Sequence, residues 1–429
     1  MSRVILAPLS SKTNIGMDDL VCTRPGTRSY VDESDGLIKY AAANVPVFGS
    51  KGVNHLGEDG YTQFLDWTED FTEWVAPRLN TTGLTYIDGP LGEATAFPLV
   101  GNTDNSSHAV YVDIAGWADD TVMQSVYHVH PNTGDYGSRY CCIALATKNG
   151  TWPKAYFDLQ EGTVTSSTCD GASISGPDQF GFYTCRAWQD MGAGVATANN
   201  GLRACLVDGS TTFEGDNETP NLWISHAQVI EGTVEREYVP SSGAAVVQSG
   251  ETLTIPINAT LEDLLSDALP SGTPTPSEFT LFFEVTPEFN AADVTGSVNL
   301  VSVQDTGASI SAYDAANTQF EAFDSANTAL VNSGLVKDAT YIQAVRGKSS
   351  TSKLNTAVSA DAGVNWTVGT DATYDGAFPM DTNLIFGADS NLPANYRWLP
   401  VYDEWVPDAR LTSAFYGSSP GMGMDMKMG

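Results

Sequence analysis

Between about residues 61 and 245 the chain shows short runs in which apolar and polar residues alternate, separated by clusters of Gly, Pro, Asn and Asp. This pattern is typical of antiparallel strands that bury one face and expose the other. The spacing predicts a β-sandwich for residues 61–245. The expected strands are Ala109–Ile114, Val122–His130, Ser138–Ala146, Ala155–Leu159, Phe182–Ala187, Leu202–Leu206 and Leu222–Ile230.

A second series of such runs lies between residues 246 and 412, which predicts a second sandwich. One short helix is expected at Leu261–Leu269, before a proline-containing loop. The expected strands are Phe279–Val285, Ser297–Val303, Tyr341–Arg346, Leu354–Ser359, Leu384–Phe386 and Trp398–Tyr402. The fold class is therefore predicted to be all-β, with two antiparallel sandwiches of the jelly-roll type.

The two ends of the chain follow neither pattern. Residues 1–60 are punctuated by prolines and glycines and predict an extended arm, with a turn at Asp32–Gly36 between strands at Thr27–Val31 and Leu37–Tyr40. Residues 413–429 are rich in Gly and Met. This segment is interpreted either as a flexible tail or as a contact arm, because Met packs into irregular apolar grooves.

The net charge narrows the classes of partner. The 429 residues carry 20 basic and 52 acidic groups, which gives a formal charge of −32. Nucleic acids and anionic membranes require Lys and Arg for neutralisation, so neither is an expected partner. No apolar run is long enough to span a bilayer, and the first residues do not have the pattern of an export signal.

Five of the six cysteines lie between residues 141 and 205, and no CxxC pair occurs. A zinc ribbon is therefore not expected. Two alternatives remain for these cysteines. They are buried thiols, as in proteins that fold in a reducing cytoplasm, or they pair across the sandwich, for example Cys169 with Cys185. We favour thiols.

Four stretches, in order along the chain, resemble virion proteins of tailed bacteriophages. The first is the TRPGTRSYVD and DGLIKYAAANVPVF sequence of residues 23–48, which is similar to an element that precedes a sandwich in phage head-fibre and tail-fibre proteins. The others resemble parts of their carbohydrate-binding-like jelly roll. They are Trp67–Trp74, Ala155–Val164 with Gly181–Arg186, and Leu222–Gly232 with Tyr238–Ser242.

The C-terminal part is similar to laminin-G or concanavalin-like domains. The stretches that carry this resemblance are Tyr341–Arg346, Asn383–Gly387 and Trp398–Trp405. Domains of this kind hold Ca²⁺ with loop oxygens, so the resemblance leaves Ca²⁺ as an alternative to no cofactor. The loop aspartates considered for it are Asp305, Asp314, Asp324, Asp375, Asp381, Asp389 and Asp403.

The resemblance implies a structural protein on the surface of a phage particle: a head fibre, spike, decoration or tail-fibre appendage that contacts host surface glycans. It implies a homo-oligomer, in particular a trimer, and contacts with capsid, portal, collar or tail proteins. The residues expected to dock the arm on the particle are Arg24, Arg28, Tyr30, Leu37 and Phe48. The alternatives are a receptor-binding lectin of the tail and a capsid-cementing protein.

Candidate glycan-binding residues are Trp366, Trp398, Trp405 and Asp403, because sugars stack on flat rings beside acids. Glu69 and Asp70, near Trp67 and Trp74, resemble the paired carboxylates of a glycosidase, but packing of the aromatic rings in the sandwich is favoured. No nucleophile elbow or phosphate-binding loop occurs, so no catalytic residue is assigned and the chain is not expected to be an enzyme.

The pair His128 and His130 lies on one face of a predicted strand, because side chains alternate with a period of two. Two imidazoles at this spacing bind Zn²⁺ when a third ligand approaches, and His226 or His108 would be available. A solvated or hydrogen-bonded pair is the favoured interpretation. No metal site is assigned.

Overall fold

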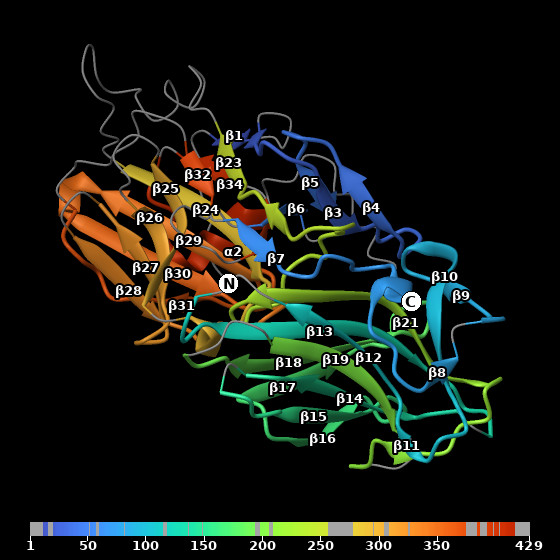
Figure 1. The fold of residues 1–429 in the computed structure, drawn as a ribbon. Helices are drawn as coiled ribbons and strands as arrows, with labels where there is room; N and C mark the ends of the chain where they lie inside the picture. Colours follow the sequence, from blue (N-terminus) through green and yellow to red (C-terminus); the bar gives the residue numbers. More distant parts are fainter. Residues whose placement is uncertain are drawn as a thin grey trace, which may run out of the picture.

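The computed structural model builds the chain almost entirely from antiparallel strands, arranged in two layered halves with the N-terminal segment beside both (Figure 1). It describes residues 12–15, 20–50, 52–56, 60–80, 82–114, 118–135, 137–147, 149–193, 198–205, 209–255, 278–294, 296–303, 309–324, 327–374, 384–386, 393–397, 399–402 and 404–416. The predicted helix at Leu261–Leu269 lies outside these residues.

Two sheets face each other in the first half of the fold. The larger has the order β17(Gly171–Ser175), β18(Tyr183–Asp190), β13(Val122–Pro131), β21(Pro220–Glu231), β10(Gly92–Gly101) and β8(Leu79–Asn80), with β9(Ile87–Gly89) beside β10. The smaller has the order β12(Ala109–Ile114), β19(Ala198–Cys205), β14(Tyr140–Leu145), β15(Lys154–Asp158) and β16(Thr163–Ser167). A short pair, β11(Ser106–Ser107) and β20(Thr212–Phe213), lies apart from both sheets.

The core of this first sandwich is filled from both sheets and from the segment that enters it. Tyr127 and Phe157, on opposite sheets, are fully buried in one apolar cluster. Phe71 in the short 3₁₀ helix η2(Phe71–Glu73) and the neighbouring Trp74 belong to the same cluster, with their ring centroids 5.1 Å apart. The favoured interpretation of the Trp67–Trp74 stretch as sandwich packing is therefore confirmed.

The second half contains a larger pair of sheets. One has the order β31(Thr367–Val368), β30(Lys353–Ser359), β29(Tyr341–Lys348), β24(Glu278–Pro287), β33(Ala394–Arg397), β6(Gly52–His55) and β5(Val47–Gly49), with β34(Leu399–Tyr402) joining β24 to β1(Lys12–Ile15). The opposing sheet has the order β2(Val21–Thr23), β23(Thr252–Ile255), β32(Leu384–Phe386), β25(Ser297–Val303), β26(Ser309–Asp314), β27(Gln319–Phe323) and β28(Thr328–Asn332).

Strand β24 is buried on both faces of its sheet. Phe279, Leu281 and Phe283 face the second sandwich core, while Phe282 faces the other side of the sheet. There it is covered by the C-terminal helix α2(Leu411–Tyr416) and residues around it. The remaining short helices are η3(Ala291–Asp293), η4(Ser349–Thr351) and η5(Asp408–Arg410). The helix continues the chain past the predicted end of the second sandwich at residue 412.

The N-terminal segment, predicted to be an extended arm, supplies strands to the second sandwich. In the described residues β1 pairs with β34, β2 with β23 and β6 with β33, and β5 adds to the outer edge of β6. β3(Arg28–Val31) and β4(Ile38–Ala41) form a separate hairpin. That residues 1–60 act as a particle-docking arm stays a prediction.

The β3–β4 hairpin turns where the sequence predicts. Asp32 and Leu37 close the turn through a 2.9 Å backbone hydrogen bond, and Gly36 has a φ of +62°, which favours glycine. Beside it, β7(Tyr61–Gln63) pairs with β22(Val246–Gln248), where the chain passes between the two halves. The all-β fold class is thus confirmed, with every described strand pair antiparallel. None of the described helices has the length and apolar character to cross a membrane.

Candidate functional site

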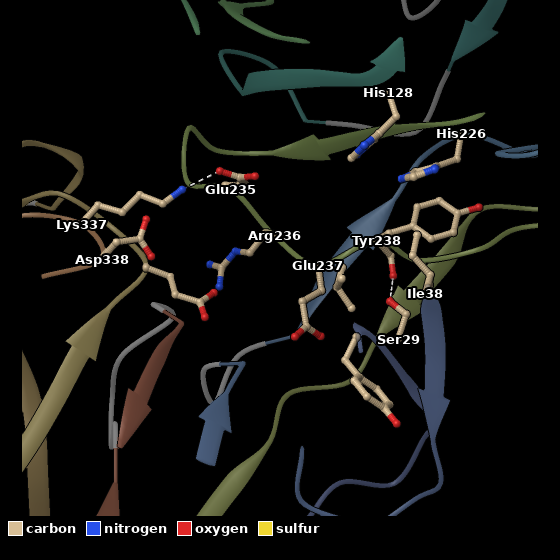
Figure 2. Close-up of a pocket in the computed structure, with 13 residues that line it drawn as sticks. Ser29, Ile38, His128, His226, Glu235, Arg236, Glu237, Tyr238, Lys337 and Asp338 are labelled. Carbon is tan, nitrogen blue, oxygen red and sulfur yellow. Dashed lines mark hydrogen bonds and ion pairs between the residues drawn. The ribbon is translucent and has the colours of Figure 1, made fainter. Parts of the chain in front are cut away.

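A cleft of about 280 Å³ lies between the first sandwich, the β3–β4 hairpin and loops of the second sandwich (Figure 2). Its walls therefore come from segments far apart in the sequence. We call it the junction cleft. It is lined by Ser29, Tyr30, Val31, Ile38, His128, His226, Glu235, Arg236, Glu237, Tyr238, Glu288, Lys337 and Asp338.

Two stacked histidines form one wall of the junction cleft. His128 on β13 and His226 on β21 have ring centroids 3.7 Å apart and nearly parallel planes, and Tyr238 packs on the other side of His226 at 4.3 Å. In the register of β13 with β21, Val126 pairs with Gln228 and Tyr127 with Ala227, so His128 and His226 are the next facing positions, beside an irregularity between Tyr127 and Val129. Figure 2 shows the two rings next to each other, on the side of the cleft away from Lys337.

Burial controls the charge of this pair. It lowers the pKa of His128 to about 4, against a raising effect from Glu235. It also holds the pKa of His226 well below its usual range, and the neighbouring His128 lowers it further. Both imidazoles are therefore neutral at pH 7, so each offers one donor and one acceptor. Nε2 of His226 is buried and has no hydrogen-bond partner among the described groups, while Nδ1 contacts the Ser225 hydroxyl at 3.1 Å.

Ion pairs occupy the opposite side of the cleft. Glu235 binds Lys337 at 2.6 Å and Arg186 at 3.4 Å. Burial opposes ionisation of Glu235, but these two cations together hold its pKa below the ordinary value. Lys337 belongs to the second sandwich, so Glu235 connects the two halves across the cleft.

Glu237 differs from Glu235 although it also has a basic partner. Its carboxylate pairs with the guanidinium group of Arg28. Burial nevertheless raises the pKa of Glu237 to about 7, with Arg28 opposing and the nearby Glu288 contributing to the rise. Glu288 itself accepts hydrogen bonds from Asn54 at 2.6 Å and from Asn395 at 2.8 Å, and burial raises its pKa.

The floor beneath the cleft is a fully buried network of charges. Glu251 binds Arg28 at 2.7 Å and Arg24 at 3.1 Å, with none of the three side chains exposed. Arg24 also donates to the backbone carbonyls of Ala42 and Val45 at 2.7 and 3.0 Å. The network ties the N-terminal segment to β23 and, through Arg28, to the segment that follows β21.

These positions bear on the five residues predicted to dock the arm on a particle. The guanidinium groups of Arg24 and Arg28 are occupied inside the chain, where both pair with the buried Glu251. The two arginines therefore do not form a docking surface in this structure. Tyr30 lines the cleft, Leu37 is half-buried, and Phe48 on β5 is 53% exposed.

Two of the four predicted glycan residues lie within the described part of the chain. Trp398 and Asp403 lie outside the described residues. Trp366 is half-buried; its Nε1 donates to the Gly363 carbonyl at 3.0 Å and to the Thr412 hydroxyl at 3.2 Å. Trp405 is also half-buried and lies under the guanidinium group of Arg346, 4.8 Å from the ring centroid.

The remaining acidic candidates make local contacts. Asp70 caps η2, and Glu69 accepts a 2.8 Å hydrogen bond from the Tyr238 hydroxyl. Asp314 and Asp324 accept hydrogen bonds within their own turns. Among the described residues no group of three or more His, Cys, Asp or Glu could hold a metal ion. The other loop aspartates considered for Ca²⁺, Asp305, Asp375, Asp381 and Asp389, lie outside the described residues with Asp403.

The structure also shows the contacts of the histidines considered as zinc ligands and of the cysteines. His226 meets His128, whereas His130 packs against Phe182 and Trp223, and both ring nitrogens of His108 contact backbone carbonyls. The cysteines are thiols in this structure. The sulfur atoms that come close are those of Cys141 and Cys185, at 3.8 Å, and not those of Cys169 and Cys185.

Sequence reasoning missed the acidic and basic residues of the cleft. Glu235, Arg236 and Glu237 form a run of charge immediately after an apolar strand, in a chain with only 17% charged residues. That concentration of charge was the available signal. Lys337, by contrast, has no feature in the sequence that connects it with this run.

No protein-family model matches the chain, and no curated protein matches it. Among solved structures it is similar to the botulinum neurotoxin serotype D binding domain, with 7% identity and a TM-score of 0.25 over 40% of this chain and 41% of that one. The chain thus spans about two fifths of that domain. A candidate carbohydrate binding protein from Bacteroides ovatus has 11% identity and a TM-score of 0.26, over 72% of this chain and 80% of that one.

A further similarity is to a sialidase of Trypanosoma rangeli in complex with sialic acid. The identity is 10% and the TM-score 0.24, over 90% of this chain and 65% of that one. Similarities this weak do not indicate what this chain binds. The chain is an all-β protein whose two sandwiches meet at a polar cleft.

Proposed function

We propose that the chain is a structural protein on the surface of a bacteriophage particle, a head fibre, spike, decoration or tail-fibre appendage. The observation that carries the proposal is the way the phage-like elements meet. The first, residues 23–48, contains the β3–β4 hairpin, and the last contains Tyr238. Arg28 pairs with Glu237 and Ser29 donates to the Tyr238 carbonyl, so the two elements form one buried joint.

A rigid joint suits a particle appendage physically. Surface-exposed domains on a particle must hold a fixed direction, and a joint of buried, mutually satisfied charges has few alternative arrangements. The formal charge of −32 supports an outward location, because it disfavours contact with packaged nucleic acid. We propose that the chain assembles as a homotrimer and that capsid, portal, collar or tail proteins anchor it.

The test is the composition of purified particles. Mass spectrometry of gradient-purified phage is expected to detect this chain in stoichiometric amount. Light scattering of the purified protein is expected to give the mass of a trimer. Absence from purified particles would contradict the proposal, and a monomer would contradict only the oligomeric state.

Three rivals share the virion location. A receptor-binding lectin of the tail is supported by the junction cleft, and electron microscopy separates it from a capsid-cementing protein by position and copy number. A depolymerase would release reducing sugar from a host polysaccharide. We propose that this chain is not an enzyme, so release of reducing sugar by the purified protein would contradict that part of the account.

A further inference from the structure

The buried nitrogen of His226 is the starting point. The side chain is 1% exposed, its Nε2 has no partner among the described groups, and the ring lines the junction cleft. An unsatisfied buried polar atom costs free energy unless something binds it. We propose that the junction cleft binds a single uncharged sugar residue, one hydroxyl of which contacts this nitrogen.

The charges around the cleft favour an uncharged ligand. Its lining carries four carboxyl groups, from Glu235, Glu237, Glu288 and Asp338. Five basic side chains offset these four and the buried Glu251 beneath them. They are Arg236 and Lys337 in the lining, Arg186, which pairs with Glu235, and Arg28 and Arg24, which both pair with Glu251. The described groups are therefore balanced, and a strongly charged ligand would leave an excess of one sign in a partly buried site.

The kinds of polar group also match a sugar. A hydroxyl is both donor and acceptor. Nδ1 of His128 contacts the Thr184 hydroxyl at 3.3 Å and Nδ1 of His226 contacts the Ser225 hydroxyl, so Nε2 of each neutral ring is the atom that a ligand hydroxyl would contact. Carboxylates such as Glu235 accept from hydroxyls, and the Tyr30 ring adds an aromatic surface to the same cleft. A metal ion fits less well, because no third ligand completes the histidine pair among the described residues.

The volume sets the size of the ligand. At about 280 Å³ the cleft lies at the lower end of the range of small-molecule sites, roughly 300–1,000 Å³. One sugar ring fits such a space, and a long stretch of polysaccharide does not. The site therefore recognises one residue of a glycan, such as an end or a branch. The proposal rests on the proposed function only for the source of that glycan.

The five histidines of the chain provide the readout. The full-length protein, labelled with ring-¹⁵N histidine, is titrated at pH 7.5 with glucose, galactose, mannose and N-acetylglucosamine, each to about 100 mM, because single sugars bind in the millimolar range. Glucosamine and N-acetylneuraminic acid serve as charged comparators. At least one neutral sugar is expected to shift the signals of His128 and His226 and to leave His108 and His130 unchanged.

Variants show that the shifts come from the cleft. E235Q and H226Q are each expected to weaken binding about tenfold or more, because each removes a hydrogen-bonding group inside the site. E161Q is the matched control, because Glu161 lies on β-turn residues of the first sandwich with its side chain 62% exposed. Thermal unfolding of each variant checks that it is folded. If H226Q does not fold, E235Q alone tests the site.

Each outcome of the titration either supports or overturns the proposal. Shifts confined to His128 and His226 that the E235Q substitution weakens support the proposal. It is overturned if no neutral sugar moves these signals, if E235Q binds like the wild type, or if a charged comparator binds more tightly than every neutral sugar. The experiment uses the purified protein alone, so its result is independent of whether the chain is found on particles.

Discussion

Arg28 donates to Glu251 across 2.7 Å inside the protein, and neither side chain is exposed. The two residues are 223 positions apart in the sequence, in the N-terminal hairpin and at the start of the strand that enters the second sandwich. Because Arg28 also pairs with Glu237 after the first sandwich, a single guanidinium group connects three segments of the chain. The joint between the sandwiches therefore depends on one side chain that three segments share.

Replacing Arg28 with Met is expected to lower the free energy of unfolding by about 3–5 kcal/mol, because Glu251 and Glu237 lose a buried partner. Urea unfolding followed by tryptophan fluorescence measures the change. The control is Lys353→Met, which breaks an exposed 2.5 Å pair with Asp371 and is expected to cost about 1 kcal/mol or less. Equal effects of the two substitutions would contradict the structural role of the network.

Stability is expected to fall as the pH is lowered from 6.5 toward 4. Burial lowers the pKa of His55 and His128 to about 4 and that of His226 further, so in this range the unfolded chain takes up protons that the folded chain does not. Each histidine contributes up to about 1.4 kcal/mol per pH unit.

Glu237 acts in the opposite sense over part of this range. Its pKa is raised to about 7, so the folded chain holds a proton that the unfolded chain has released, and this contribution favours folding as the pH falls. Glu288 acts in the same direction as Glu237, because burial raises its pKa as well. The three histidines outweigh these two carboxyl groups. Urea unfolding between pH 4 and 7 measures the net slope, and H128Q is expected to make it shallower. A stability that rises on acidification would contradict these assignments.

Alkylation is expected to distinguish Cys169 from the other cysteines. Cys169 is half-buried, whereas Cys141, Cys142 and Cys185 are fully buried. Burial raises the pKa of Cys169 to about 11 and that of Cys142 to about 12, so both react slowly and exposure sets the order. Peptide mapping after timed treatment with iodoacetamide should find Cys169 labelled first, and all six labelled together only in urea. Early labelling of Cys141 would contradict the packing.

Trp366 is expected to act in packing and not in glycan binding. Its indole N–H is bonded within the chain and its ring contacts Phe282 edge-on. W366F should therefore cost about 1 kcal/mol of stability, through the lost hydrogen bond, and leave the binding of any sugar unchanged. Isothermal titration with a bound sugar checks the second part. A loss of binding in a folded W366F protein would restore the sequence-based hypothesis.

The sequence predicted the strands well where one face is buried. Val122–His130 and Leu222–Ile230 are rich in apolar residues. The strands β13 and β21, which bury most of their residues, lie within a few residues of those bounds. Strands such as β16 were missed because most of its side chains are exposed and it has few apolar positions to mark it. The hydrophobic pattern of a strand depends on the burial of its side chains, so an exposed strand at the edge of a sheet is hard to predict from sequence.

The site was harder to predict because it depends on packing between distant segments. The sequence predicts a glycan site at tryptophan rings. In the structure the ring and the indole N–H of Trp366 are occupied within the chain. Arg24 and Arg28 were taken as docking residues, because a sequence does not show that Glu251 will lie between them. The stacking of His128 on His226 depends on the register of β13 against β21, which no local pattern of the sequence encodes.

The location of the chain on a particle is the central claim. Electron microscopy of particles purified from a producing culture, labelled with gold-conjugated antibody against this chain, tests it most directly. Gold at regular positions on the outside of intact particles is the expected result, with labelling abolished by prior incubation of the antibody with purified protein. Intact particles that carry no gold, with the chain found only in the particle-free lysate, would contradict the account.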